Sequence, residues 1–296
     1  MKASEKTLPT LLEPAVPDTR DPAYGLGAKI GTNQPDLRKN PGLWPMFLVY
    51  GPGLIRRTLG LAHQSEQIAD LGCGCGWLTL EMARANRQAV VHGVDKNEKL
   101  IRWADTYYQR FAGSGSLGEV AYTASDISLF ELTPGRYDLI VVSFLMGCLE
   151  NPGELLSRVH RALKPGGTLV YYDACDPPAI TLDRLARLRH TLARARGKMS
   201  DPWSERRRLQ AGFAKDAVRR LRPEKAPPEQ HLFHRIEEMF EVTYEARTRA
   251  FIDLSLPHIP PRRVMIYVPF YKLVDELCMA IGYLEGSCRY VVARKR

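Results

Sequence analysis

The chain has 296 residues, a net charge of +9 and 45% hydrophobic residues. This length predicts one large domain or one domain with an insertion, and the apolar content is enough for a substantial core. The sequence has no uninterrupted apolar run of about 18 residues, which excludes an ordinary membrane-spanning helix. Since the first residues also lack the apolar stretch of a signal peptide, we expect a cytoplasmic protein.

The positive charge is concentrated in one stretch of the chain. Between Arg184 and Lys225 there are 14 lysines and arginines and only 4 acidic residues, so this stretch carries a surplus of ten positive charges. The rest of the chain is close to neutral. The surplus of positive charge therefore belongs to this one region and affects what that region binds.

Residues 1–22 contain four prolines and no hydrophobic periodicity, which is typical of a loose arm. Residues 23–49 place Tyr24, Trp44 and Phe47 among glycines and prolines, which favours an irregular lid. The alternative is that these aromatic side chains simply pack on the core. A short helix is expected over residues 52–61.

Residues 68–76, Ile-Ala-Asp-Leu-Gly-Cys-Gly-Cys-Gly, are the most informative stretch. A short apolar run stops at three alternating glycines, and helix-forming residues follow over 77–85, so the pattern predicts a strand, a tight loop and a helix. The spacing is neither that of the dinucleotide fingerprint nor that of a phosphate-binding P-loop. We therefore predict a site for a different nucleotide.

Residues 70–76 resemble the acidic-x-Gly-x-Gly-x-Gly motif of class I S-adenosylmethionine-dependent methyltransferases. The resemblance implies S-adenosyl-L-methionine as cofactor and S-adenosyl-L-homocysteine as product. It implies that Gly72, Cys73, Gly74 and Gly76 lie against the methionine and ribose, and that Asp70 accepts hydrogen bonds from the ammonium group, directly or through water. The alternative is a glycine-rich turn without a ligand.

A second strand is expected over residues 89–95, and it ends in Asp95, 19 residues after Gly76. At this distance a nucleotide-binding α/β fold places a carboxylate on the ribose hydroxyls. The alternative is a solvated aspartate at a strand end. Lys96, the next residue, is included in the expected cofactor site.

A helix over residues 96–111 and a short third strand over 120–123 lead to Asp126 and Ile127. By the same resemblance these two residues flank the adenine, with Asp126 accepting from its amine. The alternative for Asp126 is a turn aspartate.

Residues 137–143 read as a central parallel strand buried on both faces. The resemblance implies that Ser143 and Phe144, at the end of this strand, contact the cofactor. Many small-molecule methyltransferases carry a histidine near the position of Gly147 and Cys148, and this chain does not. That departure argues against a histidine base on this strand.

The turn Lys-Pro-Gly-Gly at 164–167 matches the family's entry into a fifth strand, and Asp173 ends that strand. Ligands of open α/β sheets bind beyond the carboxyl ends of the strands, so Asp173 is a candidate to orient an amine or to accept a proton. Its alternative role is to cap the following helix.

These patterns predict a Rossmann-like, seven-stranded, mostly parallel sheet with helices on both faces and a helical lid inserted between the fifth and sixth strands. We divide the chain into an N-terminal arm and lid (1–50), a cofactor-binding core (51–176), a basic helical insertion (177–232) and a C-terminal completion of the sheet (233–296). Within the last part we expect a strand over 241–246, a proline-rich link over 254–268, a helix over 271–281 and a final strand over 288–293.

The resemblance implies in-line transfer of a methyl group from sulfur to a nucleophile. Since the positive charge of the sulfonium already activates the methyl group, most of the work is alignment with water excluded. A general base helps only if the acceptor carries a proton that must leave early. The candidates for a catalytic role are Asp173, His234, His258 and Tyr24. Because an N-terminal segment of this family often covers the cofactor, Tyr24 is also expected in the cofactor site.

Six cysteines lie at 73, 75, 148, 175, 278 and 288 without a C-x-x-C pair, so we interpret them as reduced and expect no metal site. Three substrate hypotheses remain open. The first is a small-molecule acceptor of biosynthesis or lipid metabolism. The second is a nucleic acid gripped by the basic insertion, against which the stretch has few aromatic residues. The third is peripheral contact of a basic helix with an anionic membrane, with or without catalysis.

Overall fold

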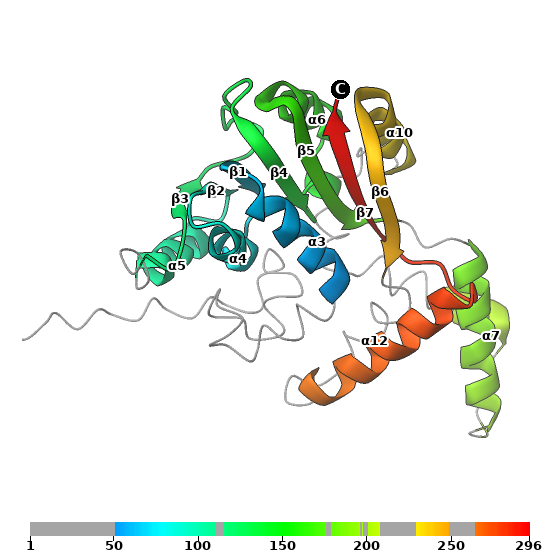
Figure 1. The fold of residues 1–296 in the computed structure, drawn as a ribbon. Helices are drawn as coiled ribbons and strands as arrows, with labels where there is room; N and C mark the ends of the chain where they lie inside the picture. The colour runs from blue at the N-terminus through cyan, green and yellow to red at the C-terminus, as the bar shows by residue number, and fades with distance from the viewer. Residues whose placement is uncertain are drawn as a thin grey trace, which may run out of the picture.

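The computed structural model describes residues 51–109, 115–175, 179–195, 197, 201–207, 229–248 and 264–296. Its centre is a seven-stranded sheet in the order β3-β2-β1-β4-β5-β7-β6 (Figure 1). The strands from β3 to β5 are all parallel, whereas β7 runs antiparallel between β5 and β6. The predicted Rossmann-like, mostly parallel sheet is confirmed. The strands are β1 (Gln67–Leu71), β2 (Val90–Asp95), β3 (Glu119–Ala124), β4 (Tyr137–Ser143), β5 (Leu163–Ala174), β6 (Phe240–Thr248) and β7 (Cys288–Lys295).

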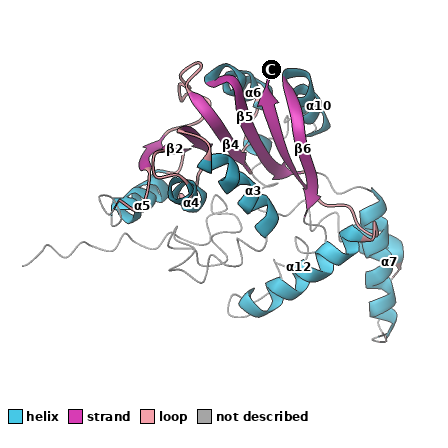
Figure 2. Ribbon diagram, viewed as in Figure 1, coloured by secondary structure: helices cyan, strands magenta, loops and turns pink. Residues whose placement is uncertain are grey.

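Helices cover both faces of this sheet (Figure 2). One face packs against α3 (Pro52–His63), α4 (Trp77–Ala85) and α5 (Glu98–Gln109), and the other against α6 (Pro152–Ala162) and α10 (Glu229–Met239). Neighbouring residues of a strand serve opposite cores: in β5, Tyr172 belongs to the first core and Tyr171 to the second, and each is 1% exposed. This burial on both faces explains the near-continuous apolar runs of the central strands.

Two further helices, α7 (Ala179–Ala195) and α12 (Val264–Ala280), lie beyond the carboxyl end of β5 and away from the sheet (Figure 1). Leu182, Leu185 and Ala186 of α7 form a small buried cluster with Leu284, which follows α12, and Cys278 and Met279 of α12 pack against this cluster. We call α7, residues 202–207 and residues 264–287 the helical lobe. It is tied to the sheet where the Cys175 amide donates to the Ser287 carbonyl at 2.8 Å. None of the described helices is long and apolar enough to cross a bilayer.

The structure differs from the sequence-based expectations in the second half of the chain. The expected link over 254–268 is helical from Val264 onward, and α12 runs through Pro269. Pro269 lies in the second turn of α12, so the helix continues past it despite the backbone hydrogen bond that a proline removes. The expected boundary at 232/233 falls inside α10. Residues 202–207 are helical, as expected of the basic insertion, while residues 208–228 of that insertion and the N-terminal arm (1–50) lie outside the described residues.

Candidate cofactor site

The glycine loop joins the carboxyl end of β1 to the first turn of α4. The amides of Gly72 and Cys73 donate to the carbonyl of Val94 in β2, at 2.8 and 3.1 Å, and the Gly76 amide donates to the Cys73 carbonyl at 2.9 Å. Gly72, Gly74 and Gly76 all have positive φ, at +76°, +56° and +72°. Because side chains with a Cβ rarely adopt this conformation, the loop needs glycine at each position.

The two sides of the loop differ in how closely they are packed. A Cβ on Gly74 would meet no atom within 4 Å, so this residue faces open space. A Cβ on Gly76 would lie 2.5 Å from the Tyr122 hydroxyl, and one on Gly93 would lie 2.8 Å from the Tyr122 ring. The Tyr122 hydroxyl also donates to the Gly76 carbonyl at 3.3 Å. The loop is thus packed tightly on the sheet below it and open at Gly74.

Asp95, at the end of β2, holds the open part of the loop. One carboxylate oxygen accepts the Gly74 amide at 2.9 Å, and the other accepts the Asn97 amide at 2.8 Å. Each carboxylate oxygen has a second lone pair, so Asp95 can still accept hydroxyl donors. An open glycine loop with a carboxylate at its rim fits the ribose and methionine portions of S-adenosylmethionine. Lys96, the next residue, is exposed.

Asp70 lies beneath the loop and is 2% exposed. The Thr79 hydroxyl of α4 donates to its carboxylate at 2.6 Å, which pins β1 to α4. Burial is the largest effect on this carboxyl and raises its pKa to about 6, although the Thr79 hydrogen bond acts in the opposite direction. In this position Asp70 supports the loop from below. Its expected contact with an ammonium group stays a prediction.

The cysteines near the loop are small, buried spacers. Cys73 is 7% exposed, and burial raises the pKa of its thiol well above the usual range. Its sulfur lies beside Gly93 of β2, 3.1 Å from where a Cβ on that glycine would stand, and its expected place in the cofactor site stays a prediction. All six cysteines are free thiols, which agrees with the reduced state expected from the sequence.

The carboxyl end of β4 carries a second unusual backbone conformation. Phe144 has φ of +51°, the only positive φ at a non-glycine residue in the described part of the chain. Its amide donates to the Tyr172 carbonyl at 2.7 Å, and its ring packs edge-on against Tyr172 at 4.8 Å between centroids. Such a conformation persists only where surrounding contacts hold it, and it is most common at functional sites. Ser143, next to it, is half-buried.

Asp173 ends β5 and is 2% exposed. Its carboxylate accepts the amide of Gly147 at 3.0 Å, in the 3-10 turn Met146–Cys148 that follows β4. Burial, together with the Asp173 carboxylate, raises the pKa of the nearby Cys148 thiol to about 12. The expected capping of the next helix is wrong, because α7 begins at Ala179, too far along the chain for Asp173 to be its cap.

Asp126 and Ile127 follow β3 at the same edge of the sheet. The Ser125 amide donates to the Asp95 carbonyl at 3.0 Å, which joins this segment to the end of β2. Asp126 is exposed, and its carboxylate accepts the Ser128 amide at 2.8 Å. Ile127 is 6% exposed and belongs to the core under α6. Asp126 is therefore free to reach a ligand at the surface, whereas the Ile127 side chain points into the core.

The structure does not bring His234 to the glycine loop, which corrects its candidacy as a catalytic residue. Leu232 and Ile236 form the buried face of α10, so the His234 side chain points outward and is 71% exposed. Its ring lies 3.2 Å from the Glu238 carboxylate of the same helix. The other two candidates, Tyr24 and His258, lie outside the described residues.

Sequence reasoning missed two residues that shape the loop, Thr79 and Tyr122. Gly93 offered a signal for Tyr122, because a glycine inside a strand often marks a close approach by a neighbour. Gly93 pairs with Tyr122 across β2 and β3. Thr79 offered no comparable signal, since its hydrogen bond to Asp70 depends on how α4 docks on the sheet.

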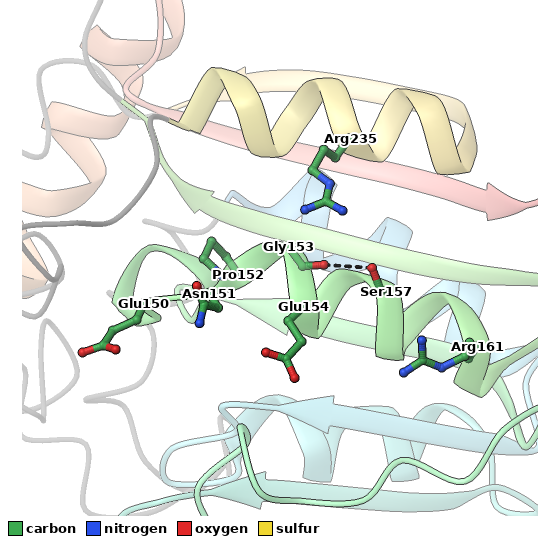
Figure 3. Close-up of a pocket in the computed structure, with 8 residues that line it drawn as sticks. All are labelled: Glu150, Asn151, Pro152, Gly153, Glu154, Ser157, Arg161 and Arg235. Carbon is green, nitrogen blue, oxygen red and sulfur yellow. Dashed lines mark hydrogen bonds between the residues drawn. The ribbon is translucent and has the colours of Figure 1, made fainter.

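A polar pocket of about 610 Å³ lies beside α6 (Figure 3). Arg235 points into it from α10, while Glu154 and Arg161 point from α6 away from α10. The Ser157 hydroxyl donates to the Gly153 carbonyl within the helix at 3.0 Å. None of the residues predicted for the cofactor or for catalysis lines this pocket, so it is separate from the glycine loop. It is lined by Glu150, Asn151, Pro152, Gly153, Glu154, Ser157, Arg161 and Arg235.

Comparison with known families identifies this part of the chain. Residues 69–169 match the model of the methyltransferase domain family, and the match includes the glycine loop, Asp95 and the Lys-Pro-Gly-Gly turn. Residues 69–169 are a methyltransferase domain. The sheet order and the glycine loop make it a domain of the class I, S-adenosylmethionine-dependent type. S-adenosylmethionine is the cofactor that this methyltransferase domain implies.

Curated relatives match the methyltransferase domain and part of its surroundings. A 23S rRNA (uracil(1939)-C(5))-methyltransferase from Chromobacterium violaceum is 28% identical over 195 residues, covering 61% of this chain and 36% of that protein. A ubiquinone/menaquinone biosynthesis C-methyltransferase from Hydrogenovibrio crunogenus is 31% identical over 104 residues, covering 35% of this chain and 40% of that protein. The chain thus spans well under half the length of these relatives.

Solved structures extend the similarity beyond the methyltransferase domain in fold alone. The crystal structure of MccD protein aligns with a TM-score of 0.51 and 15% identity, covering 83% of this chain and 98% of that one. At this level of identity the likeness supports the shared fold and carries no information on the acceptor.

Proposed function

We propose that this chain is an S-adenosylmethionine-dependent methyltransferase acting on a small-molecule acceptor, either a biosynthetic metabolite or a lipid-like compound. The observation that carries the proposal is the hydrogen bond from the Gly74 amide to Asp95 at 2.9 Å, at the open side of the loop. This arrangement leaves a surface without side chains beside a carboxylate that can accept two hydroxyls. S-adenosylmethionine, when bound, would supply a methyl group on a positively charged sulfur.

The residues that would hold the cofactor lie along one edge of the sheet. Asp95 would accept the ribose hydroxyls, and Gly74 would let the ligand approach the backbone closely. Asp126, exposed at the neighbouring strand end, would accept from the adenine amine. The helix α4 begins directly after the loop, so its N-terminal amides would face the bound ligand.

Asp173 would act as a positioning residue. Its carboxylate fixes the Gly147 amide, and this contact holds the turn that follows Phe144. A buried acid already engaged in this way is poorly placed to accept a proton from an acceptor. We therefore assign the rate enhancement mainly to alignment and exclusion of water, which an activated methyl donor allows.

A small acceptor is favoured over a nucleic acid because several arginines of the basic stretch are used within the protein. The Arg184 guanidinium donates to the Tyr283 carbonyl at 2.6 Å. Arg189 and Arg206 pair with Glu205 and Asp183 at 3.0 and 2.8 Å. The quinone-biosynthesis relative supports a small acceptor, whereas the rRNA relative supports a nucleic-acid acceptor.

The test is transfer of a labelled methyl group from S-adenosylmethionine to a panel of acceptors. The panel contains a quinol-type phenol, a carboxylate carried on a thioester and total RNA. We expect label in a small-molecule acceptor, and no label in any acceptor with Asp95→Ala. The matched control is Asp105→Ala, on α5, where the carboxylate accepts a hydrogen bond from Gln109 of the same helix. Label in RNA alone would replace the small-molecule proposal by the nucleic-acid one.

A further inference from the structure

Large apolar side chains at the surface are concentrated on the helical lobe. The described residues include eight exposed large hydrophobic residues, and seven belong to the lobe. The exception is Leu129, in the loop after β3. The seven are Leu188, Trp203, Phe270, Leu273, Leu277, Ile281 and Tyr283. Scattered single residues of this kind need no explanation, but such a concentration marks an interaction surface.

Four of these residues form one stripe along α12 and the turn that follows it. Phe270, Leu273, Leu277 and Ile281 are three or four positions apart and therefore share one face of the helix. They are 60%, 56%, 56% and 77% exposed. The polar residues Lys272 and Asp275, at 5% and 0% exposure, lie on the side toward the protein. The helix thus presents its apolar face outward.

The helical lobe also carries exposed cations. Its residues include seven lysines and arginines and five acidic residues. Arg187 and Arg194 are exposed on this helix, on either side of the exposed Leu188 in sequence. The Arg207 guanidinium lies 3.5 Å from the centre of the Trp203 ring, which is 59% exposed. Exposed tryptophan, leucine and arginine together are typical of helices that lie in the interface of an anionic membrane.

We propose that the helical lobe is a docking surface for an anionic lipid bilayer, with the α12 stripe inserted at the level of the headgroups and the arginines against the lipid charges. An RNA partner would leave the apolar stripe unexplained, and a second copy of the chain would leave the cations unexplained. The lobe joins the sheet beside the carboxyl end of β5, at the same edge as the glycine loop. The proposal goes beyond methyl transfer and does not depend on it.

The test is flotation of the full chain with phosphatidylcholine vesicles, with and without phosphatidylglycerol. We expect binding that requires phosphatidylglycerol and weakens as salt rises. The double variant Leu273→Gln/Leu277→Gln should weaken binding about tenfold or more, because two leucine side chains no longer enter the interface. Arg187→Ala should weaken it about fivefold. The matched controls are Leu129→Gln and Arg87→Ala. They change exposed residues in the sheet and its connections outside the helical lobe, which we call the sheet body, and should bind as the parent does.

Three results would overturn the docking proposal. One is absence of vesicle binding at low salt. Another is vesicle binding that the α12 double variant leaves unchanged. The third is a dimer in light scattering that the same double variant dissociates, together with no vesicle binding, which would assign the stripe to a second copy. Since vesicle binding needs no cofactor, Asp95→Ala should dock normally, and a failure of docking leaves the methyltransferase proposal untouched.

Discussion

The sheet body and the helical lobe differ in how completely they bury their apolar side chains. In the body, β4 is flanked by β1 and β5 and buried by helices on both faces, and its residues from Leu139 to Val142 are completely buried. In the described part of the lobe, the buried cluster between α7 and the turn after α12 has only four residues, and long apolar side chains remain at the surface. The body uses its apolar residues for its own stability, whereas the lobe leaves many available for a partner.

The same apolar spacing therefore has different meanings in the two regions. A continuous apolar run in the body reports burial between two layers of helices. The helical spacing of apolar residues in α12 would ordinarily report burial too, but here it faces outward. Whether an apolar pattern marks a buried or an exposed face depends on whether another layer of the protein covers that helix or strand.

The largest effect is expected from shortening core side chains in the two regions. Leu139→Ala in β4 should lower the free energy of unfolding by about 3 to 5 kcal/mol, because its rigid surroundings cannot close the cavity. Leu185→Ala in α7 should cost about 2 kcal/mol, since a small cluster relaxes more easily. Urea denaturation gives both values. Hydrogen exchange should show loosening confined to α7 and α12 for Leu185→Ala, and equal loosening of the sheet would contradict the division into two regions.

The next largest effect is a loss of ligand affinity that we expect for Gly74 in the glycine loop and not for Gly135 in another turn. Gly74→Val and Gly135→Val both place a β-branched residue at positive φ, +56° and +64°, where neither Cβ meets a neighbour within 4 Å. Both should lose similar stability, about 1 to 2 kcal/mol. Only Gly74→Val should lose affinity for S-adenosylhomocysteine, by about 100-fold or more. Equal affinities for the two variants would remove Gly74 from the cofactor site.

A smaller effect concerns the buried acid under the loop. Because the pKa of Asp70 is raised to about 6 in the folded protein, the folded state binds more protons than the unfolded state between about pH 4 and 6. This carboxyl therefore costs stability as the pH rises through that range, and the full penalty is present at pH 7. Asp70→Asn keeps an acceptor for Thr79 and should raise stability by about 1 to 2 kcal/mol at pH 7.5. The gain should shrink toward zero at pH 4 in urea titrations, and a constant gain would refute the assignment.

The smallest effect tests how residues 202–207 are attached to the lobe. Arg206 pairs with Asp183 of α7 at 2.8 Å, with side chains 35% and 49% exposed. A double-mutant cycle with Arg206→Ala and Asp183→Ala should give a coupling of about 0.5 kcal/mol, because solvent screens a pair this exposed. A coupling near zero would show that this pair does not fix the segment.

The body was largely predictable from sequence because its signals are local. The strands followed from short apolar runs, the loop from its glycines, and Asp95 from its distance to Gly76. The Asp70 contact with Thr79 and the strained backbone of Phe144 depend on docking between elements distant in sequence, so no local pattern revealed them. His234 shows an avoidable error, since the leucine and isoleucine two residues to either side already predicted its outward direction.

The lobe was harder to predict. The basic stretch and the apolar residues of α12 were visible in the sequence, but they are separated by β6 and about 40 residues of chain. Only the fold brings α7 and the end of α12 together, where Cys278 and Met279 pack against the cluster of Leu182, Leu185 and Leu284. The coincidence of charge and exposed apolar surface therefore appears only in three dimensions.

The central claim is that the glycine loop and Asp95 form the cofactor site. Isothermal titration of S-adenosylhomocysteine into the parent chain, Asp95→Ala and Asp105→Ala tests it most directly. We expect micromolar binding to the parent chain and to Asp105→Ala. Binding to Asp95→Ala should be about 100-fold weaker or more, because this variant loses charge-assisted hydrogen bonds to the ligand. Equal binding by all three proteins, or no binding by a folded parent chain, would contradict it.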